Sequence, residues 1–266
     1  IEQAPGKKNF LYDSLGVPFT KIITQKNKPY NLPILCINTT RMQDGSPGVI
    51  SNIKISDSVF NGRIDVLSLL NEKQDMRLST GIVLGASFPY LSPAGRIDYK
   101  KCDTCLAEAN YFVDGGYFDN SGAGVVFEMI FDLQRIIASD TTLKNKDKIE
   151  FQIIHITNDL TDEIKLKPVN PLANDLMAPF KTLLGAYGTQ TSVNDLRLKT
   201  YINNLYNDKL HYTVLSLYKK NDPMDYTMSW VISKYVLNAI DKRLHSDEEI
   251  KNLIKRINKL NNKSGN

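Results

Sequence analysis

The sequence predicts an α/β fold, a layered sheet with helices on both faces. Short apolar runs typical of buried strands alternate along the chain with longer segments of helical periodicity, and this alternation builds layered α/β folds. The helical segment after Ser121 has one narrow polar stripe, made by Glu128, Asp132 and Arg135, and is apolar on nearly every other side. A helix of that kind packs against a sheet and against other helices at once.

The first part of the chain predicts a lead-in followed by a hairpin. Residues 1–30 are polar, with glycine, proline and lysine scattered through them, and we expect them to be irregular. "LPILCINTT" from Leu32 is a short apolar run closed by polar residues, which predicts a buried strand. The turn sequence "MQDGSPG" separates it from an alternating segment that begins at Val49, so we expect the two strands to form a hairpin.

The remaining segments continue the alternation to the end of the chain. The pattern predicts helices over 68–75, 78–89, from Ser121, 171–186, 191–206 and 230–245, a hairpin over 97–111, and strands from Lys148 and Lys209. Ser246 opens a last helix, with Glu249 three residues later in the spacing of a capping box. Because no repeat and no linker is visible, we expect residues 31–266 to belong to one domain.

The bulk composition excludes several classes of protein. Hydrophobic residues make up 42% and charged residues 23%, values that are ordinary for a soluble globular protein. The net charge of +4 is small and scattered, with no basic run interleaved with aromatic residues, so we expect no nucleic-acid partner. No apolar run approaches the ~20 residues of a membrane span, and no signal peptide is visible. These features favour a cytoplasmic or membrane-associated location.

The cysteines and histidines give no sign of a metal site. Three cysteines make no disulfide framework in a chain of this length, which mildly favours reducing surroundings. Cys102 and Cys105 have the spacing of half a zinc site, but a second pair is missing. We therefore expect two neighbouring thiols on a hairpin, and no metal and no cofactor. His155 lies within an apolar strand, which favours a satisfied core histidine over a catalytic one.

The stretch "YFVDGGYFDNSGAG", residues 111–124, carries the candidate chemistry. Three apolar residues end in Asp114, two glycines follow, and a polar turn leads into the apolar helix. In α/β sheets, functional groups collect where strands end and helices begin. Gly115 and Gly116 accept backbone angles that other residues avoid, and they leave room for another backbone or a ligand. A carboxylate held beside a cleared space suits a general base, whereas the alternative interpretation is a plain Asp-Gly turn.

Several segments together resemble the patatin-like phospholipase family. "VDGGYFDNSG" resembles the family's Asp-Gly-Gly motif, including the following asparagine, here Asn120. "LSTGIVLGASFPYLSP", residues 78–93, resembles its Ala-Ser-x-x-x-Pro helix, and "LPILCINTT…DGSPGVIS" resembles its hairpin with a small polar pair after a buried strand. "DYTMSWVISKYVLNAID", residues 225–241, resembles a Trp-x-x-Ser helix near the end of some bacterial members. The resemblance runs from Asn31 to Asp241.

This resemblance implies a lipid acyl hydrolase with a Ser–Asp dyad on a patatin-like fold, here partial. In such a dyad a serine attacks the ester carbonyl and an aspartate is its base, with no histidine between them. Asp114 corresponds to that aspartate, and Gly115 and Gly116 correspond to its turn. The implied partner is a lipid or acyl-ester substrate. The lysine-rich segment 251–263 is interpreted mainly as a solvated helix face, and the alternative is a weak attraction to an anionic membrane surface.

The sequence departs from the family at the nucleophile. The serine should lie upstream of the aspartate in a Gly-x-Ser-x-Gly elbow, beside a glycine-rich loop that forms the oxyanion hole. The nearest match is "GASFP", in which Ser87 is central but Pro89 replaces the second glycine. Ser46 lacks the first glycine of the elbow, and Ser121 lacks both.

Two hypotheses follow from the missing elbow. The chain begins at Ile1 rather than at methionine, and we expect it to be the C-terminal portion of a longer hydrolase. The missing N-terminal part would then carry the serine and the oxyanion loop, and this chain alone would be inactive. The alternative is a non-catalytic scaffold or interaction domain on the same fold.

Overall fold

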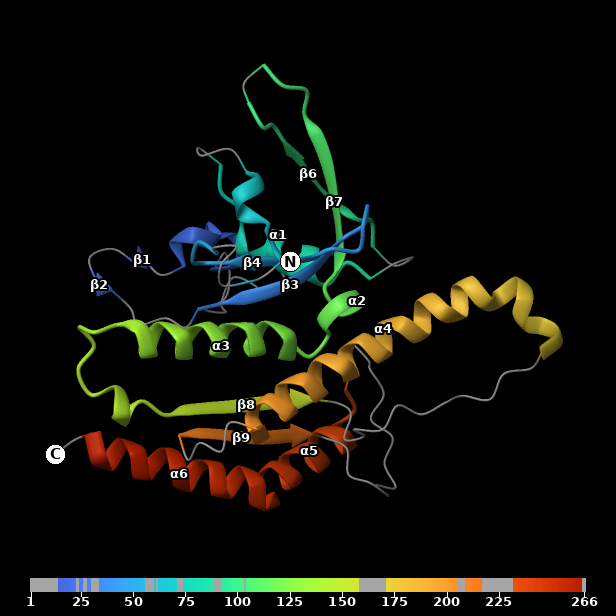
Figure 1. Cartoon of the computed structure of the whole chain (residues 1–266). Helices are drawn as coiled ribbons and strands as arrows, with labels where there is room; N and C mark the ends of the chain where they lie inside the picture. The colour runs from blue at the N-terminus through green and yellow to red at the C-terminus, as the bar shows by residue number, and fades with distance from the viewer. Residues whose placement is uncertain are drawn as a thin grey trace. The chain divides into compact units, whose positions relative to one another are not determined.

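The chain forms two compact units, which are described one after the other. The computed structural model describes residues 14–22, 24–25, 28–29, 34–55, 60, 62–70, 74–88, 92–102, 104–157, 171–204, 209–216 and 232–264. The first unit comprises residues 1–141 and 168–198, and the second comprises residues 142–167 and 199–266. Figure 1 labels the helices and strands.

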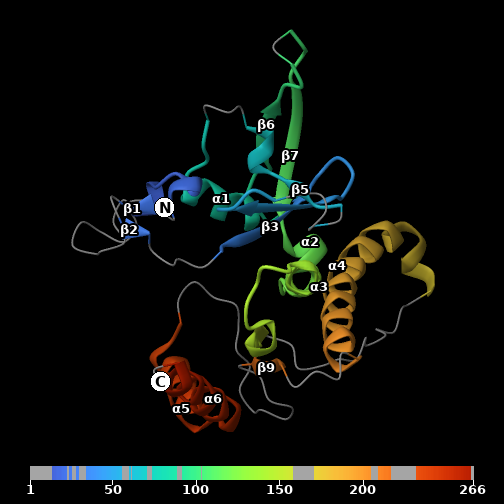
Figure 2. The same ribbon diagram turned by 60° about the vertical axis from the view of Figure 1, so that its left-hand side comes forward.

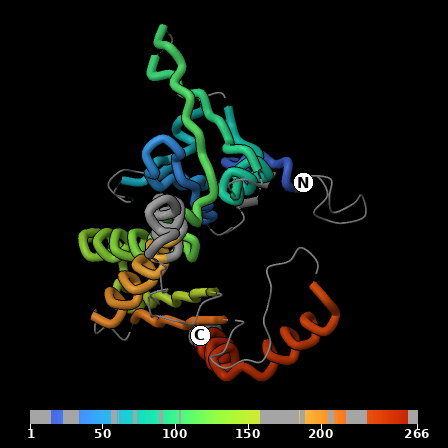
Figure 3. The backbone as a smooth tube through the Cα atoms, turned by 90° about the vertical axis from the view of Figure 1, so that its right-hand side faces the viewer, coloured from blue at the N-terminus to red at the C-terminus, as the bar shows by residue number. Residues whose placement is uncertain are grey.

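The first unit is built on a five-stranded mixed sheet. Its strands follow in the order β5 (Ile64–Asp65), β4 (Pro47–Ser51), β3 (Cys36–Arg41), β7 (Glu108–Asp114) and β6 (Gly95–Tyr99). Every neighbouring pair is antiparallel except β4 with β5, which is parallel. The two predicted hairpins are confirmed as the β3–β4 and β6–β7 pairs. Figures 1 and 3 show the second hairpin projecting beyond the rest of the sheet.

Helices and short elements complete this unit. The helices are α1 (Leu78–Gly85), α2 (Gly116–Asp119), α3 (Ala123–Ser139) and α4 (Pro171–Asn204), of which α4 continues into the second unit. The short elements are the 3₁₀ turns η1 (Ser14–Gly16), η2 (Phe19–Lys21) and η3 (Leu67–Leu69), and the strand pair β1 (Thr24–Gln25) and β2 (Lys28–Pro29). Figure 2 shows α2 between the end of β7 and α3, with α4 beside it.

Separate cores lie on the two sides of the five-stranded sheet. Val49 and Ile50 are adjacent in β4 and fully buried, and neighbouring strand residues face opposite sides of a sheet. Ile50 packs in one core with Phe112 of β7 and Leu84 of α1, whereas Val49 packs in the other with Val125 of α3. Full burial of such a side chain contributes about 1.5–3 kcal/mol, so the apolar faces of α1 and α3 hold these helices to the sheet.

The second unit contains a parallel strand pair and two helices. Its elements are the 3₁₀ turn η4 (Lys146–Lys148), the strands β8 (Phe151–Thr157) and β9 (Leu210–Ser216), and the helices α5 (Lys234–Ser246) and α6 (Glu248–Ser264). β8 and β9 pair in parallel over their whole length. Helix α6 packs along β9, as Figure 1 shows, and buries Leu253.

Two predicted helical segments differ from the structure. The helix expected over 68–75 is the single 3₁₀ turn η3, with residues 71–73 outside the described residues. The helices expected over 171–186 and 191–206 form one helix, α4. Gly188 separates the two predicted segments, but a glycine inside a helix costs only about 1 kcal/mol and keeps its N–H donor, so the helix continues through it.

The residue that caps the last helix lies one position later than predicted. Ser246 ends α5, and its hydroxyl donates to the carbonyl of Arg243. Asp247 caps α6 instead, because its Oδ1 accepts hydrogen bonds from the N–H groups of Glu249 at 2.9 Å and Ile250 at 3.3 Å. The capping box at Ser246 and Glu249 is therefore wrong, although the predicted helix is present.

The mixed α/β class is confirmed, with helices packed against a five-stranded sheet. Most of the predicted lead-in, Pro89, and residues 217–231 with Trp230 lie outside the described residues. The extent of a single domain over 31–266 stays a prediction.

Candidate functional site

Asp114 is the last residue of β7 and lies opposite Thr39 of β3. Its N–H donates to the carbonyl of Ser87 at 3.1 Å, which ties the end of the strand to the segment after α1. Its side-chain Oδ1 accepts a hydrogen bond from the N–H of Gly116 at 2.7 Å. Among the described residues this is the only hydrogen bond of the carboxylate, so its second oxygen can accept a proton from another group.

Partial burial adjusts the acidity of Asp114. Burial raises the pKa of its carboxyl above the ordinary value for aspartic acid. The hydrogen bond from the Gly116 N–H opposes that rise, because it stabilises the charged form. A raised pKa favours a general base, since proton transfer is most effective when the pKa of the base is near the working pH.

Gly115 lies where the turn after Asp114 touches β3. A Cβ added at Gly115 would lie 2.3 Å from the carbonyl oxygen of Asn38 and 2.6 Å from its Cβ. The N–H of Gly115 donates to the carbonyl of Gly85 at 3.2 Å, and a Cβ on Gly85 would lie 2.9 Å from the same oxygen of Asn38. The backbone of Asn38 is thus approached closely by two glycines, a contact that side chains would prevent.

Two reasons were predicted for glycine at positions 115 and 116, namely unusual backbone angles and room for another backbone or a ligand. Gly115 has a φ of −66° and a ψ of −22°, and Gly116 starts α2 with helical backbone. The glycines with positive φ in the described part of the chain are Gly45, Gly62 and Gly122. Unusual backbone angles are therefore the wrong explanation for Gly115 and Gly116. Close approach of another backbone is confirmed at Gly115, and that backbone is β3.

Two polar residues of β3 hold the turn at both its ends. The hydroxyl of Thr39 donates to the carbonyl of Val113 at 2.6 Å, immediately before Asp114. The Nδ2 of Asn38 donates to the backbone carbonyl of Asp119 at 3.0 Å and to its Oδ2 at 3.2 Å, where α2 ends. Asn38 and Thr39, which lie next to each other in the first hairpin, therefore both bond to the segment that contains the Asp-Gly-Gly turn.

A buried ion pair lies next to α2. Asp119 and Arg63 are 2% and 5% exposed, and Arg63 Nη2 lies 3.3 Å from Asp119 Oδ2. The same carboxylate oxygen accepts the N–H of Val125 at 3.1 Å. Arg63 Nε donates to Glu128 Oε2 at 2.6 Å, and burial raises the pKa of Glu128 although the guanidinium opposes the rise. The guanidinium carbon of Arg63 lies 5.6 Å from the ring centre of Phe118.

Helix α4 also bonds to this turn. Asn194 is buried, and its Nδ2 donates to the carbonyl of Phe118 at 2.9 Å. The N–H of Asn120 donates to the Oγ1 of Thr191 at 3.3 Å. Residues three apart share one helix face, so a single face of α4 anchors the end of α2 and the residue that follows it.

None of the candidate serine hydroxyls is hydrogen-bonded to the carboxylate of Asp114 in the described part of the chain. Ser87 is 1% exposed, and its hydroxyl donates to the carbonyl of the residue four positions earlier at 2.6 Å. The hydroxyl of Ser121 donates to the carboxylate of Asp195. Ser46 lies in the turn between β3 and β4. Within the described part of the chain, no serine hydroxyl is hydrogen-bonded to the carboxylate of this aspartate.

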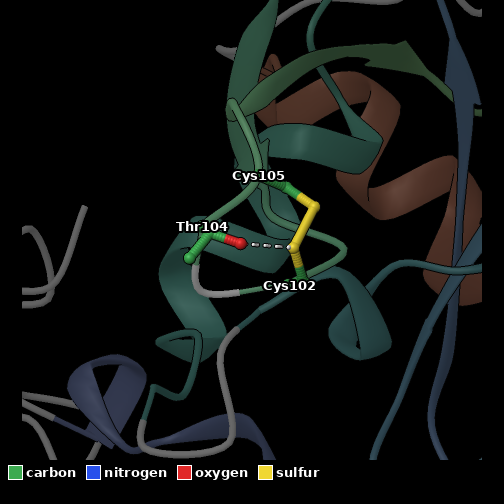
Figure 4. The surroundings of a disulfide bond; sticks show 3 residues. All are labelled: Cys102, Thr104 and Cys105. Carbon is green, nitrogen blue, oxygen red and sulfur yellow. Dashed lines mark hydrogen bonds between the residues drawn. A yellow bond between two sulfur atoms is a disulfide. The ribbon is translucent and has the colours of Figure 1, made fainter.

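Cys102 and Cys105 form a disulfide near the tip of the β6–β7 hairpin, as Figure 4 shows. The N–H of Cys105 donates to the carbonyl of Cys102 at 3.1 Å, so a tight turn brings the two Cα atoms to 5.1 Å, within the range that a disulfide spans. The hydroxyl of Thr104 lies 3.4 Å from the Sγ of Cys102. The prediction of two neighbouring thiols is therefore wrong, because the backbone turn holds the sulfurs at bonding distance.

His155 belongs to the core of the second unit. It is buried, which confirms the predicted core position, and its Nδ1 lies 2.7 Å from the hydroxyl of Tyr212. Among the described residues, no group of three or more His, Cys, Asp or Glu side chains is arranged to hold a metal ion. No helix in that same part of the chain combines the length and apolarity needed to cross a membrane.

Sequence reasoning missed the residues around the Asp-Gly-Gly turn. Asp119 lies inside the quoted motif, and its position in a largely apolar stretch was the available signal, because a charged residue in such a place needs a partner. Arg63 carried no such signal, since it precedes β5 and lies 56 positions earlier than Asp119. Asn38 and Asn194 gave none either, because only the folded chain brings them to the turn.

Comparisons with known proteins add no assignment. A scan against models of protein families, a search of curated proteins and a search of solved structures each found no match to this chain. The geometry of the described residues and the motif resemblance therefore carry the functional inference.

Proposed function

We propose that this chain is the C-terminal portion of a patatin-like lipid acyl hydrolase and supplies the aspartate of its Ser–Asp dyad. One observation carries the proposal: Asp114 ends β7 with a half-buried carboxylate, of which one oxygen is held by the Gly116 N–H and the other is unbonded among the described residues. The Asp-Gly-Gly spacing and the resemblance of the flanking segments agree with it. A mixed sheet with α1 and α3 on opposite sides is compatible with part of a patatin-like layered domain.

In the proposed reaction Asp114 moves protons while a serine makes and breaks bonds. It takes the proton of the serine hydroxyl as the serine oxygen attacks the ester carbonyl carbon, and it returns that proton to the departing alcohol. It then takes a proton from water as the water oxygen attacks the carbonyl carbon of the acyl-serine, and it gives that proton to the departing serine oxygen as the fatty acid is released. The reaction needs no cofactor. The raised pKa of Asp114 supports this role, because it strengthens the carboxylate as a base.

The serine and the oxyanion loop are proposed to lie on an N-terminal part of the parent protein. Ser87 is unsuited because it is buried and its hydroxyl is bonded within the chain. Ser121 is unsuited because its hydroxyl is bonded to Asp195. The unbonded oxygen of Asp114 would accept the hydrogen bond of the incoming serine. The substrate is then a lipid or another acyl ester, taken from a membrane surface where it is a phospholipid.

A non-catalytic scaffold is the second candidate. The observation that favours it is that the Asp114 carboxylate has no serine partner in the described chain. In that case Asp114 only orders the start of α2, through its hydrogen bond to the Gly116 N–H.

A fluorophosphonate probe, which labels activated serines, separates the two candidates. We expect the parent protein to be labelled on a serine of an N-terminal Gly-x-Ser-x-Gly elbow, and its Asp114→Asn variant to lose the label. The 266-residue chain should stay unlabelled. The scaffold would be favoured if the parent gene has no in-frame Gly-x-Ser-x-Gly elbow. It would also be favoured if the parent is labelled to the same extent with and without the Asp114→Asn change.

A further inference from the structure

The buried ion pair of Arg63 and Asp119 is weak evidence for a purely stabilising role. Both side chains are almost fully buried, and removing two charges from water costs free energy that their attraction does not reliably recover. An apolar pair of similar volume is often at least as stable. An apolar pair cannot reproduce the directed hydrogen bonds of Arg63 and Asp119. The partners of these hydrogen bonds therefore indicate what the ion pair does.

One carboxylate oxygen joins three segments of the chain. Asp119 Oδ2 accepts from Arg63 Nη2 at 3.3 Å, from Asn38 Nδ2 at 3.2 Å and from the Val125 N–H at 3.1 Å. These donors come from the segment before β5, from β3 and from the start of α3. The planar guanidinium of Arg63 also donates to Glu128 of α3 at 2.6 Å. The guanidinium thus donates to two carboxylates from two of its nitrogens in a fixed planar geometry. A lysine ammonium is a point charge on a flexible stem and does not reproduce this geometry.

The backbone of Gly124 in α3 packs closely against this oxygen. A Cβ added at Gly124 would lie 2.7 Å from Arg63 Nη2 and 2.8 Å from Asp119 Oδ2. The glycine after the turn therefore permits the close contact of the ion pair with α3. Asn38 has a fixed orientation as well, because Asp119 offers it only acceptors and so selects its Nδ2.

The ion pair is coupled to Asp114 through a very short path. The N–H of Asp119 donates to the carbonyl of Gly115 at 2.9 Å, and the backbone of Gly115 packs against Asn38. Gly116 then holds the carboxylate of Asp114 through its N–H. Fixing Asp119 therefore fixes the backbone that directs the candidate base.

We propose that Arg63, Asp119 and Asn38 are positioning residues that set the direction of the Asp114 carboxylate. None of them touches the reacting atoms; each acts through the turn of residues 114–119. The catalytic consequence rests on the proposed function, whereas the positioning itself is a property of this chain.

Hydrogen exchange measured by NMR on the 266-residue chain tests the positioning directly. We expect Arg63→Lys and Asp119→Asn to speed exchange of the Gly115 and Asp119 amides about 10-fold or more, with residues 48–51 of β4 changed much less. Arg96→Lys is the matched control, because Arg96 also has a carboxylate partner, Asp98, and an aromatic neighbour, Tyr111, but is 57% exposed. Unchanged exchange at the turn, or an equal increase in β4, would overturn the proposal.

A second variant covers the case in which the single changes unfold the chain. The double replacement Arg63→Met with Asp119→Leu removes both charges together, and it is made in a Glu128→Gln background so that Glu128 is not left charged without the guanidinium. We expect it to fold and still to exchange faster at Gly115 than the unchanged chain does. Native protection of Gly115 in this folded double variant would contradict a positioning role.

Activity of the parent protein separates this inference from the proposed function. If the parent hydrolyses an ester, Asp119→Asn should lower kcat about 10- to 100-fold, the loss expected when a catalytic group is misplaced by about 1 Å, and leave KM within about threefold. An active parent whose Asp119→Asn variant keeps its kcat would refute the inference and leave the proposed function standing. An inactive parent would refute the proposed function, and hydrogen exchange would still decide the positioning.

Discussion

The guanidinium of Arg63 and the carboxylate of Asp119 lie 3.3 Å apart in the interior of the first unit, although 56 positions separate them in the chain. Asp119 comes five residues after Asp114, so this ion pair holds the far end of the turn that carries the candidate base. Asn38 contacts the same turn at Gly115 and at Asp119. Together these contacts explain how a short turn can present a carboxylate in one fixed direction.

Replacing Gly115 with alanine should destabilise the chain. The new Cβ would lie 2.3 Å from the carbonyl oxygen of Asn38, so the turn or β3 must move, and overpacking of this kind costs about 1–3 kcal/mol. The free energy of unfolding in urea measures the loss. Gly185→Ala is the control, since in the described part of the chain no atom outside the helix's own nearby backbone lies within 4 Å of a Cβ there, and alanine is favoured over glycine in a helix by about 1 kcal/mol. Equal losses in both variants would contradict the close contact.

Asp114→Asn should raise the melting temperature at neutral pH. Burial raises the pKa of Asp114 in the folded chain, so the folded state holds this proton more tightly than the unfolded state. Protonated Asp114 therefore stabilises the folded state. This stabilisation is complete at pH values below the pKa of Asp114 in the unfolded chain, about 3.9. It is lost as the pH rises through the higher pKa of Asp114 in the folded chain. Asparagine resembles the protonated form and keeps an oxygen for the Gly116 N–H. The gain is small, because water screens a half-exposed carboxylate.

Thermal unfolding at pH 7 and at pH 3 checks this expectation. The gain of Asp114→Asn over the unchanged chain should be present at pH 7 and absent at pH 3, where the carboxyl of the unchanged chain is itself protonated. A variant that melts lower than the unchanged chain at both pH values would show that burial does not disfavour the charge of Asp114.

The pH dependence of the parent's activity should report the same carboxyl. A general base must be deprotonated, so kcat/KM should fall as the pH is lowered through the pKa of Asp114. Because burial raises that pKa, the midpoint of the acid limb should lie above about 3.9, the ordinary value for aspartic acid. Initial rates of ester hydrolysis between pH 3 and pH 8 give this midpoint, and a midpoint at or below the ordinary value would speak against Asp114 as the base.

Ser87→Ala should leave the activity of the parent within a few-fold of the unchanged enzyme. Ser87 is buried, and its hydroxyl is bonded to the carbonyl of Val83. Loss of this hydrogen bond should lower the free energy of unfolding by about 0.5–1.5 kcal/mol. Steady-state kinetics and urea unfolding measure the two effects. A folded Ser87→Ala parent without activity would make Ser87 the nucleophile and remove the need for a serine elsewhere.

The sequence predicted those features that depend on neighbouring residues. The apolar run before Asp114 and the polar turn after it were enough to place this residue at the end of a strand, and β7 ends there. The two hairpins followed in the same way from short apolar runs separated by turn residues. Both the strand end and the hairpins form between residues that are close in the sequence, so a short stretch of sequence is enough to predict them.

The missed features depend on contacts between distant segments. The need for glycine at position 115 comes from the backbone of Asn38, and the burial of Asp119 depends on Arg63. No local pattern reports either partner. The disulfide of Cys102 and Cys105 was missed for another reason, since the spacing of two cysteines alone does not distinguish free thiols from a bonded pair.

Hydrolysis of a short-chain p-nitrophenyl ester tests the central claim most directly. The rate is measured for the 266-residue chain and for the parent protein, each beside its Asp114→Asn variant. We predict an active parent, a parent variant slowed about 1,000-fold or more, as losses of dyad or triad members are, and no activity in the isolated chain. A parent that keeps its rate when Asp114 is replaced by asparagine would contradict the assignment of this aspartate as the catalytic base.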